Sequence, residues 1–275
     1  MSATTLTIAQ LMAGDEPVIM GILNVTPDSF SDGGAYDRVD AAVARALAMR
    51  AEGAQVIDVG GESTRPGAQP VNAEQEIERV VPVIEAIRRQ CEVQVSIDTS
   101  KPEVMAAAVR AGANLVNDVN ALRAEGAVAC CAELGVPVCL MHMQGEPRTM
   151  QQSPVYSDVV IEVRDFLLAR AKCCMEAGIT AERILLDPGF GFGKSLEHNI
   201  ELFSRLQELC ALDFPVLIGV SRKSMLGTIL DRPVEQRVIG SVAAAVIAYG
   251  KGARWFRVHD VAETRDALEL CRVLG

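Results

Sequence analysis

The sequence predicts a single domain over residues 1–275, folded as a parallel (β/α)8 barrel of the triosephosphate isomerase (TIM) type. Short apolar segments rich in Val, Ile and Leu alternate with amphipathic segments along the whole chain, which is the pattern of repeated β–α units. Eight such strands are present, and strands that are apolar along most of their length must be parallel and covered on both faces. A doubly wound sheet would share this pattern, but eight units in 275 residues favour the closed barrel.

The expected strands and helices follow one another without a linker or a charge block that would divide the chain. We place the strands at Val18–Leu23, Gln55–Val59, Val93–Ile97, Leu115–Val116, Pro137–Met141, Arg183–Leu186, Val216–Val220 and Arg254–Val258. We place the helices at Asp40–Arg50, Ala73–Arg89, Pro102–Ala111, Ala124–Leu134, Asp158–Ala177, Leu196–Leu209, Val234–Ala248 and Ala262–Leu274. Ser100 and Glu103 have the spacing of a capping box, with Pro102 in the first helical turn.

Composition excludes several classes of partner. A formal charge of −10 argues against general binding of nucleic acid or of anionic membranes, because both require a basic surface. The first residues lack the pattern of a secretory signal, and the longest apolar run, Val238–Tyr249, is too short to cross a bilayer, so a cytoplasmic protein is expected. In this setting the eight cysteines are expected to be reduced and to pack as small apolar residues.

Polar residues follow every expected strand, at the end where the loops of such a barrel gather on one face. They are Asn24, Asp58, Asp98, Asn117 with Asp118, His142, Asp187, Ser221–Lys223, and Arg257 with His259. Any one of them taken alone is explained by a helix cap or a solvated turn. Their occurrence at all eight strand ends favours a binding site for a polar heteroaromatic ring beside an anionic group.

Other chemistries fit less well. A zinc hydrolase barrel would need clustered histidines, and the chain has only three. The stretch Gly189–Ser195 is rich in glycine but has neither the Walker A spacing nor the dinucleotide-binding spacing. Lys223 is the only lysine at an expected strand end, so an imine-forming aldolase is an alternative, although its polar neighbours favour a charged amine.

The segments around these strand ends resemble those of the dihydropteroate synthase family over essentially the whole chain. The resemblance is carried by Met20–Gly34, Asp58–Gly67, Ser96–Thr99, Asn117–Asn120, Met141–Gly145, Asp187–Lys194, Gly219–Ser224 and Arg257–Asp260. It implies a transferase of folate biosynthesis, the target of sulfonamides, which joins a dihydropterin-methyl diphosphate to 4-aminobenzoate and releases pyrophosphate. It also implies a requirement for Mg²⁺ and a homodimer.

The resemblance implies a role for each matching residue. The pterin would be bound by Asp98, Asn117, Asp187, Lys223, Phe190 and Gly219. Pyrophosphate would be bound by Asn24, Thr64, Arg257 and His259, and Mg²⁺ by Asn24. The aminobenzoate would be bound by Phe30, Thr64, Arg65, Pro66, Phe190, Lys223 and Ser224. Asp98, Lys223, Arg257 and His259 would take part in catalysis.

Two loops are expected to move over the site, and they bear on the alternative functions. The glycine-bearing loops Thr26–Gly34 and Gly60–Gly67 are expected to close over the substrates as lids and exclude water. A pterin-dependent methyltransferase shares the barrel and the pocket but has no need of these two loops. A catalytically inactive pterin-binding paralogue is the alternative from another class, and release of pyrophosphate would distinguish it from an enzyme.

Overall fold

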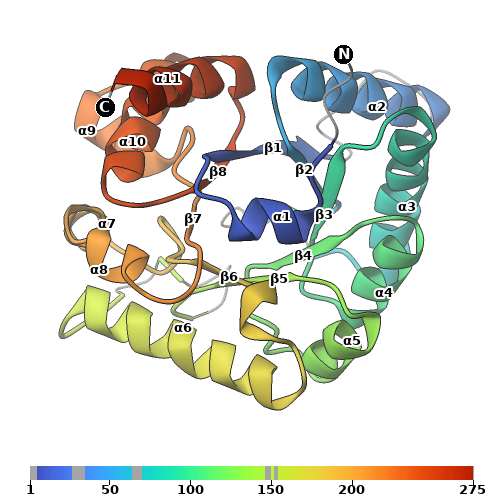
Figure 1. Cartoon of the computed structure of the whole chain (residues 1–275), viewed down its shortest axis with the longest axis horizontal. Coiled ribbons are helices and arrows are strands. Elements are labelled where there is room, and N and C mark those ends of the chain that lie inside the picture. The colour runs from blue at the N-terminus through green and yellow to red at the C-terminus, as the bar shows by residue number, and fades with distance from the viewer. Residues whose placement is uncertain (1–4, 27–34, 64–69, 146–149, 152–153, 275) are drawn as a thin grey trace.

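The chain folds into a closed barrel of eight parallel strands surrounded by helices (Figure 1). The computed structural model describes residues 5–26, 35–63, 70–145, 150–151 and 154–274, with only the backbone described for residues 35–37. The strands are hydrogen-bonded in the order β6-β5-β4-β3-β2-β1-β8-β7, and an isolated parallel bridge between Leu186 and Val216 joins β6 to β7. The barrel predicted from the sequence is therefore confirmed.

Each expected strand is present, and most begin and end within one or two residues of their predicted positions. The strands are β1 (Val18–Asn24), β2 (Val56–Gly60), β3 (Gln94–Asp98), β4 (Leu115–Asp118), β5 (Val138–Met141), β6 (Ile184–Asp187), β7 (Leu217–Ile218) and β8 (Trp255–Val258). The α-helices are α1 (Ile8–Ala13), α2 (Ala35–Glu52), α3 (Ala73–Gln90), α4 (Pro102–Arg110), α5 (Ala127–Leu134), α6 (Val159–Glu176), α7 (Leu196–Ser204), α8 (Gln207–Cys210), α9 (Ser224–Leu230), α10 (Val238–Gly250) and α11 (Val261–Leu274). Two 3₁₀ helices, η2 (Ala181–Arg183) and η3 (Val234–Gln236), complete the described elements.

Helix α1, which the sequence analysis missed, closes one end of the barrel (Figure 1). Thr7 and Gln10 form its capping box, and the side chains of Ile8, Leu11 and Met12 are buried. They join a cluster inside the barrel that includes Val18, Met20, Val56, Leu115, Cys139, Leu185, Leu217 and Trp255. This end of the barrel is therefore filled with apolar side chains, which leaves the opposite, carboxyl end for a ligand.

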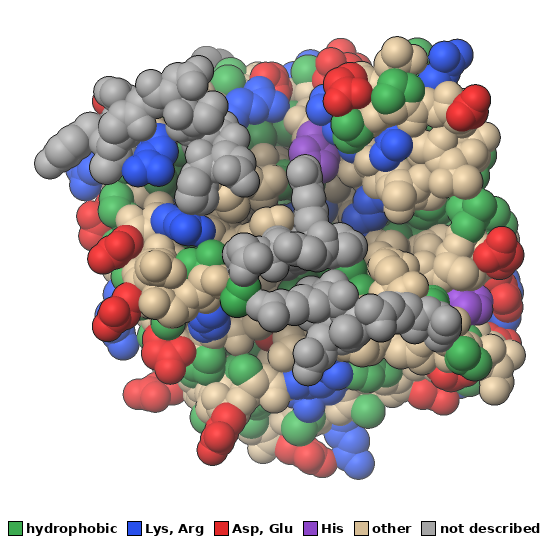
Figure 2. Space-filling view, turned by 180° about the vertical axis from the view of Figure 1, so that it is seen from behind, with side chains coloured by type: hydrophobic (Ala, Val, Ile, Leu, Met, Phe, Trp, Pro, Cys, Tyr) green, Lys and Arg blue, Asp and Glu red, His purple; other side chains and the backbone are tan. Residues whose placement is uncertain are grey.

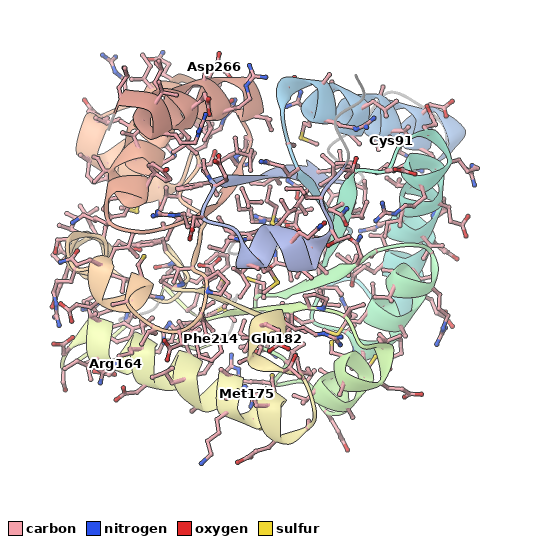
Figure 3. All side chains as sticks on the ribbon, viewed as in Figure 1. Cys91, Arg164, Met175, Glu182, Phe214 and Asp266 are labelled. Atoms are coloured by element: carbon pink, nitrogen blue, oxygen red, sulfur yellow. The ribbon has the colours of Figure 1, made fainter. Side chains whose placement is uncertain are left out.

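A second, larger core lies between the strands and the surrounding helices, and its side chains fill the space around the barrel in Figure 3. The eight cysteines are free thiols, as expected, and Cys91 follows α3 as its C-cap. Burial raises the pKa of Cys131 to about 12, so its thiol remains protonated and unreactive. Among the described residues, no helix combines the length and apolarity needed to span a membrane.

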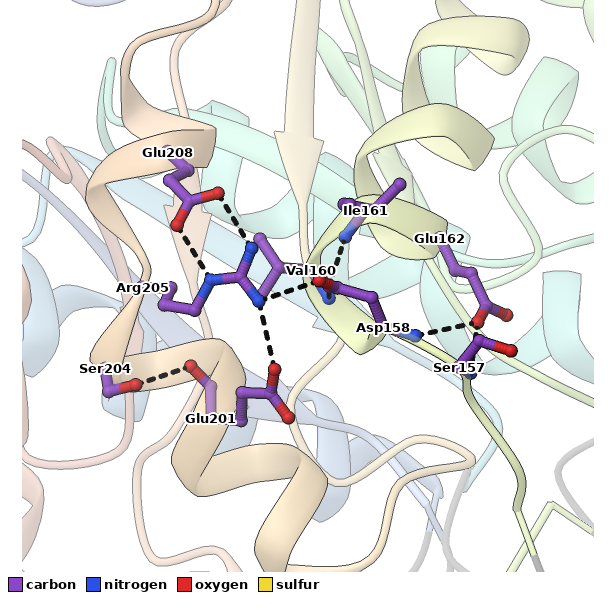
Figure 4. Close-up of polar contacts among 9 residues, drawn as sticks. All are labelled: Ser157, Asp158, Val160, Ile161, Glu162, Glu201, Ser204, Arg205 and Glu208. Atoms are coloured by element: carbon purple, nitrogen blue, oxygen red, sulfur yellow. Dashed lines mark hydrogen bonds and ion pairs between the residues drawn. The ribbon is translucent and has the colours of Figure 1, made fainter.

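One predicted helix, Leu196–Leu209, is in fact two. Arg205 lies at the break between α7 and α8, and its guanidinium contacts Glu201, Glu208 and, at 3.0 Å, Asp158 (Figure 4). Asp158 is the N-cap of α6 and accepts hydrogen bonds from the backbone of Val160 and Ile161. The break thus brings Arg205 to the start of a neighbouring helix, an interaction that hydrophobic periodicity does not encode.

The capping box expected at Ser100 and Glu103 is wrong. Lys101 is the N-cap of α4 and makes no side-chain capping bond there, although Pro102 does occupy the first turn. The hydroxyl of Ser100 instead donates to Oδ1 of Asp118, at the end of the neighbouring β4. The carboxylate of β4 therefore replaces the helix amide as the partner of Ser100.

Candidate active site

The carboxyl ends of β2, β3, β4 and β8 meet in one hydrogen-bonded group of polar side chains. Arg257 donates from Nε to Oδ2 of Asp58 over 2.6 Å and from Nη2 to Oδ2 of Asp98 over 2.7 Å. Asn117 donates to the same oxygen of Asp58 over 3.2 Å. Asp58 is fully buried, and its Oδ1 has no hydrogen-bond partner within the described part of the molecule. Asp58 therefore holds Arg257 and Asn117 in place from inside the barrel.

Asp187 and Lys223 lie on the other side of this group, at the ends of β6 and β7. A Cβ atom built on Gly219 would lie 3.8 Å from Oδ2 of Asp187, 3.8 Å from Nζ of Lys223 and 4.0 Å from Cβ of Arg257. Gly219 thus lies within van der Waals distance of three charged residues, and it brings Asp187, Lys223 and Arg257 to one place at the end of the barrel. Asp187 also accepts a 2.7 Å hydrogen bond from the backbone of Gly189, which fixes the direction of its carboxylate.

Asn24 lies at the same opening, close to Asp98. A Cβ atom on Gly60 would lie 3.7 Å from Oδ1 of Asn24 and 3.8 Å from Oδ2 of Asp98. Asn24 is exposed at the end of β1, so its amide oxygen is accessible from solvent. The described residues contain no group of three or more His, Cys, Asp or Glu side chains that could hold a metal ion. A metal at this opening would therefore depend on ligands that the substrate supplies.

His259 follows β8 and is oriented by Ser221. Oγ of Ser221 lies 3.0 Å from Nδ1 of His259 and accepts a hydrogen bond from the backbone N–H of the same histidine. The neighbouring Arg222 has a φ of +57° and forms a two-pronged ion pair with Asp260. These contacts join the loops after β7 and β8, and so fix His259 at the carboxyl end of the barrel.

Burial shifts the pKa values of Asp98, Asp187 and Lys223 toward their neutral forms. It raises the pKa of Asp98 to about 7, although the positive charge of Arg257 acts in the opposite direction. It also raises the pKa of Asp187, again against a nearby cation, Lys223. Burial lowers the pKa of Lys223 to about 8, even though the sequence analysis expected its polar neighbours to keep it fully charged. Carboxyl and amine groups with shifted pKa values at one end of a barrel are typical of a functional site.

Two of the polar residues that follow strands have structural roles instead. Asp118 accepts hydrogen bonds from the backbone of Asn120 and Leu122, and so shapes the turn after β4. His142 is buried against the amine of Lys194, and burial lowers the pKa of its imidazole to about 2. The explanation as a turn residue is therefore correct for Asp118, whereas His142 is a buried packing residue and neither a helix cap nor part of a solvated turn.

The carboxyl end of the barrel lies on the face opposite α1, which Figure 2 shows. Acidic side chains lie mostly around the rim of this face, and several Lys and Arg side chains lie nearer its middle. This distribution places cations where a local anion site needs them, although the chain as a whole carries a charge of −10.

Comparison with known proteins assigns this geometry to a family. The family model described as pterin binding enzyme matches residues 20–259. A dihydropteroate synthase of Haemophilus influenzae is 52% identical over 254 residues, which cover 92% of each chain. The chain belongs to the dihydropteroate synthase family.

Solved structures of dihydropteroate synthases support this assignment. The Xanthomonas albilineans dihydropteroate synthase with 4-aminobenzoic acid has a TM-score of 0.90 and 53% identity, and the match covers 94% of this chain and 93% of that one. The same species' dihydropteroate synthase in complex with 7,8-dihydropteroate has a TM-score of 0.86 and 50% identity, with 94% of each chain covered.

Several residues that the dihydropteroate synthase resemblance implies lie outside the described residues. They are Phe30, Thr64, Arg65 and Pro66, together with most of the two expected lid loops. Ser224 is described, and it is the exposed first residue of α9, directly after Lys223.

Phe190, which is expected to bind the pterin and the aminobenzoate, follows Gly189 in the loop after β6. The Phe190 ring is fully buried and lies 5.5 Å from the ring of Phe203, measured between centroids, so only its carbonyl oxygen reaches Lys223. The ring that lies at Lys223 is that of Phe192, whose centroid is 4.7 Å from Nζ. The sequence alone could not show which of the two rings lies at Lys223, because both phenylalanines follow a glycine in the same loop.

Proposed function

We propose that the chain is a dihydropteroate synthase in activity as well as in family. It would condense 7,8-dihydropterin-6-ylmethyl diphosphate with 4-aminobenzoate to 7,8-dihydropteroate and pyrophosphate. The observation that carries the proposal is the meeting of Asp187 and Lys223 with Arg257 around Gly219, where Asp98 binds Arg257 and Asn117 binds the same Asp58 as Arg257. Carboxylates, an amide and an amine at one opening match the donors and acceptors along the edges of a pterin.

The roles proposed for the pterin-binding residues follow from their chemistry. The carboxylate of Asp187, directed by Gly189, would accept two parallel N–H bonds from the pterin's 2-amino group and ring nitrogen. Lys223 would donate to the acceptor side of the ring. Asp98 would stabilise the electron-poor pterin while the bond between its methylene carbon and the diphosphate oxygen breaks.

The leaving group would be held at the outer edge of the site. Arg257 and His259 would stabilise the pyrophosphate, which departs with the electron pair of the broken C–O bond. Asn24 would hold Mg²⁺ with its amide oxygen, and the metal would neutralise phosphate charge and take its other ligands from water and substrate. The amine of 4-aminobenzoate then forms the new C–N bond and releases a proton to solvent.

We also propose a homodimer formed by the surface of α9, α10 and α11, which lie side by side in Figure 1. The described residues leave apolar side chains exposed on all three helices, with Ile239 at 85% and Ile247 at 52% on α10. A second copy of the chain would cover this surface, since a cytoplasmic monomer rarely leaves a large apolar area exposed.

A turnover assay tests the proposed activity. The purified chain is mixed with dihydropterin-methyl diphosphate, 4-aminobenzoate and Mg²⁺, and both products are measured. We expect pyrophosphate and dihydropteroate in equal amounts, and a loss of at least about 100-fold in kcat/KM for Asp187→Ala, because two charge-assisted hydrogen bonds are removed. Asp266→Ala, an exposed position on α11, is the matched control and should retain full activity.

Two results would contradict the proposal. Pterin binding without release of pyrophosphate would indicate an inactive pterin-binding paralogue. Transfer of a methyl group from a methylated pterin, without condensation to aminobenzoate, would indicate a methyltransferase.

A further inference from the structure

The glycine-rich segment Gly189–Lys194 ends in a buried lysine for which the proposed reaction has no use. Lys194 is only 2% exposed. Its Nζ lies 2.8 Å from the carbonyl oxygen of Gly189, 3.1 Å from that of Phe192 and 2.9 Å from Nδ1 of His142. Its partners in the described part of the chain are thus carbonyl oxygens and a ring nitrogen rather than carboxylates. An amine surrounded in this way is not accessible to a substrate phosphate.

The hydrogen bonds to the loop are the same in both protonation states of Lys194. An ammonium group has three N–H bonds, which it can donate to Gly189, Phe192 and His142. A neutral amine has two, which it can donate to the two carbonyls while its lone pair accepts Nδ1–H of His142. The carbonyl oxygens of Gly189 and Phe192 are therefore held to one point in either case.

The loop that Lys194 holds is fitted closely to the end of β5. Gly189 has a φ of +69°, and a Cβ atom there would lie 1.9 Å from the carbonyl oxygen of His142. Gly193 has a φ of +60°, and its Cβ would lie 2.4 Å from the carbonyl oxygen of Gln144. The glycines let the loop backbone approach residues 142–144, and Lys194 fixes it there from within.

The same loop touches the two residues at the centre of the proposed pterin site. The backbone N–H of Gly189 donates to Asp187, and the carbonyl oxygen of Phe190 accepts from Nζ of Lys223. The ring of Phe192 lies over that Nζ, with 4.7 Å between Nζ and the ring centroid, in the position of a cation–π contact. Residues 189, 190 and 192 each contact Asp187 or Lys223, and two of these three are bound to Lys194.

We propose that Lys194 is a positioning residue, which acts as an internal hydrogen-bond donor that shapes the loop and so places Lys223 and Asp187 for the pterin. The inference rests on the proposed function, because it assumes that these two residues bind the pterin. It assigns to the lysine a task different from that of a phosphate-loop lysine, which points outward to its ligand. Here the side chain points into the protein and binds its own loop.

A double-mutant cycle tests this role. The affinity for 6-hydroxymethylpterin, which carries the ring without the diphosphate, is measured by calorimetry for the unaltered chain, Lys194→Met, Lys223→Met and the double variant. We expect Lys194→Met to weaken binding about tenfold in the unaltered background and clearly less in the Lys223→Met background, because part of its effect passes through Lys223. An equal loss in both backgrounds would overturn the proposal.

Two further variants separate positioning from a general loss of stability. Tyr156→Phe removes a 2.7 Å hydrogen bond from the Tyr156 hydroxyl to the carbonyl oxygen of Gly193, in the same loop but away from Lys223. We expect its pterin affinity to stay within about twofold of the original. If it lowers affinity as much as Lys194→Met does, any weakening of the loop suffices and Lys194 has no specific role.

Phe192→Leu keeps the proposal testable if Lys194→Met does not fold. It leaves the contacts of Lys194 in place and removes only the ring over Lys223. We expect a loss of about threefold that vanishes in the Lys223→Met background. Unchanged affinity would show that the loop does not place Lys223 through Phe192, and it would overturn this route of positioning by Lys194. If the unaltered chain does not bind the pterin, or if Lys223→Met binds it equally well, the proposed function itself fails, and the inference fails with it.

Discussion

Asp98 and Lys223 face each other across the site with opposite charges and opposite pKa shifts. Burial raises the pKa of Asp98 to about 7 and lowers that of Lys223 to about 8. The carboxylate needed to stabilise an electron-poor pterin forms as the pH rises above the first value. The ammonium needed to donate to the ring is lost as the pH rises above the second.

The expected consequence is a narrow bell-shaped dependence of kcat/KM on pH. For the pterin substrate it should rise through about pH 7 and fall through about pH 8, because kcat/KM reports the ionisations of the free enzyme. Lys223→Arg keeps its charge at high pH, so the fall on the alkaline side should disappear from its profile. A profile of the original chain that stays flat from about pH 6 to about pH 9 would contradict the assignment.

Sequence reasoning identified which residues lie together at the site but not which of them form hydrogen bonds with one another. It placed Asp98, Asn117, Asp187, Lys223 and Arg257 at one end of the barrel, because parallel strands bring their carboxyl ends together. It could not show that Asp58 binds Arg257, since that contact joins positions 199 residues apart. The position of the Phe192 ring at Lys223 was not predicted for the same reason, because the direction of each ring depends on loop backbone that has no periodicity.

Helix α1 closes one end of the barrel, so substitutions in its buried face should lower the free energy of unfolding. Leu11 is 5% exposed and packs in the cluster that fills the barrel interior. We expect Leu11→Ala to lower the free energy of unfolding by about 2–4 kcal/mol, as for other buried leucines, with little change in kcat. Chemical denaturation gives this value, and Leu6→Ala, whose side chain is 49% exposed, should cost less than about 0.5 kcal/mol. Equal effects of the two substitutions would show that α1 does not seal the barrel.

The glycine at the start of the loop after β6 should be more sensitive to substitution by alanine than a glycine with open space around it. Gly189 and Gly178 both have positive φ, +69° and +97°, but a Cβ atom on Gly178 would meet nothing within 4 Å. Gly178→Ala should therefore cost only the backbone strain, about 1–2 kcal/mol. Gly189→Ala should cost at least about 2 kcal/mol more, because its Cβ would overlap the carbonyl oxygen of His142. Thermal unfolding of the two variants measures the difference, and similar losses would mean that the loop can move away from β5.

Elements with strong periodicity were predicted well, and short elements were not. The eight strands are continuous apolar runs bounded by polar residues, and the eight long helical segments have patterns that extend over several turns. Helices α1 and α9 have six and seven residues, too few to show a periodic face, and both were missed. The break at Arg205 was missed because ion pairs between helices, rather than a glycine or proline, accompany it.

For the whole molecule, the proposed homodimer depends on the apolar surface of α9, α10 and α11. We expect Ile239→Glu to convert the dimer to a monomer in sedimentation velocity, because it would bury an unpaired charge in the interface. Ile161→Glu on α6, where the original side chain is 40% exposed, is the matched control and should leave the dimer intact. A monomeric original chain, or dissociation by both variants, would contradict this choice of surface.

The apolar filling beneath the site determines how molecules travel to and from it. With α1 and the surrounding side chains closing the lower end of the barrel, both substrates must enter, and both products must leave, through the same upper opening. In the proposed function the pterin occupies the polar group of Asp98, Asn117 and Asp187, so we expect it to arrive before the aminobenzoate and the joined product to depart before a new pterin enters. Accumulated dihydropteroate should therefore inhibit competitively against the pterin diphosphate, because both occupy the same site and reach it through the same opening.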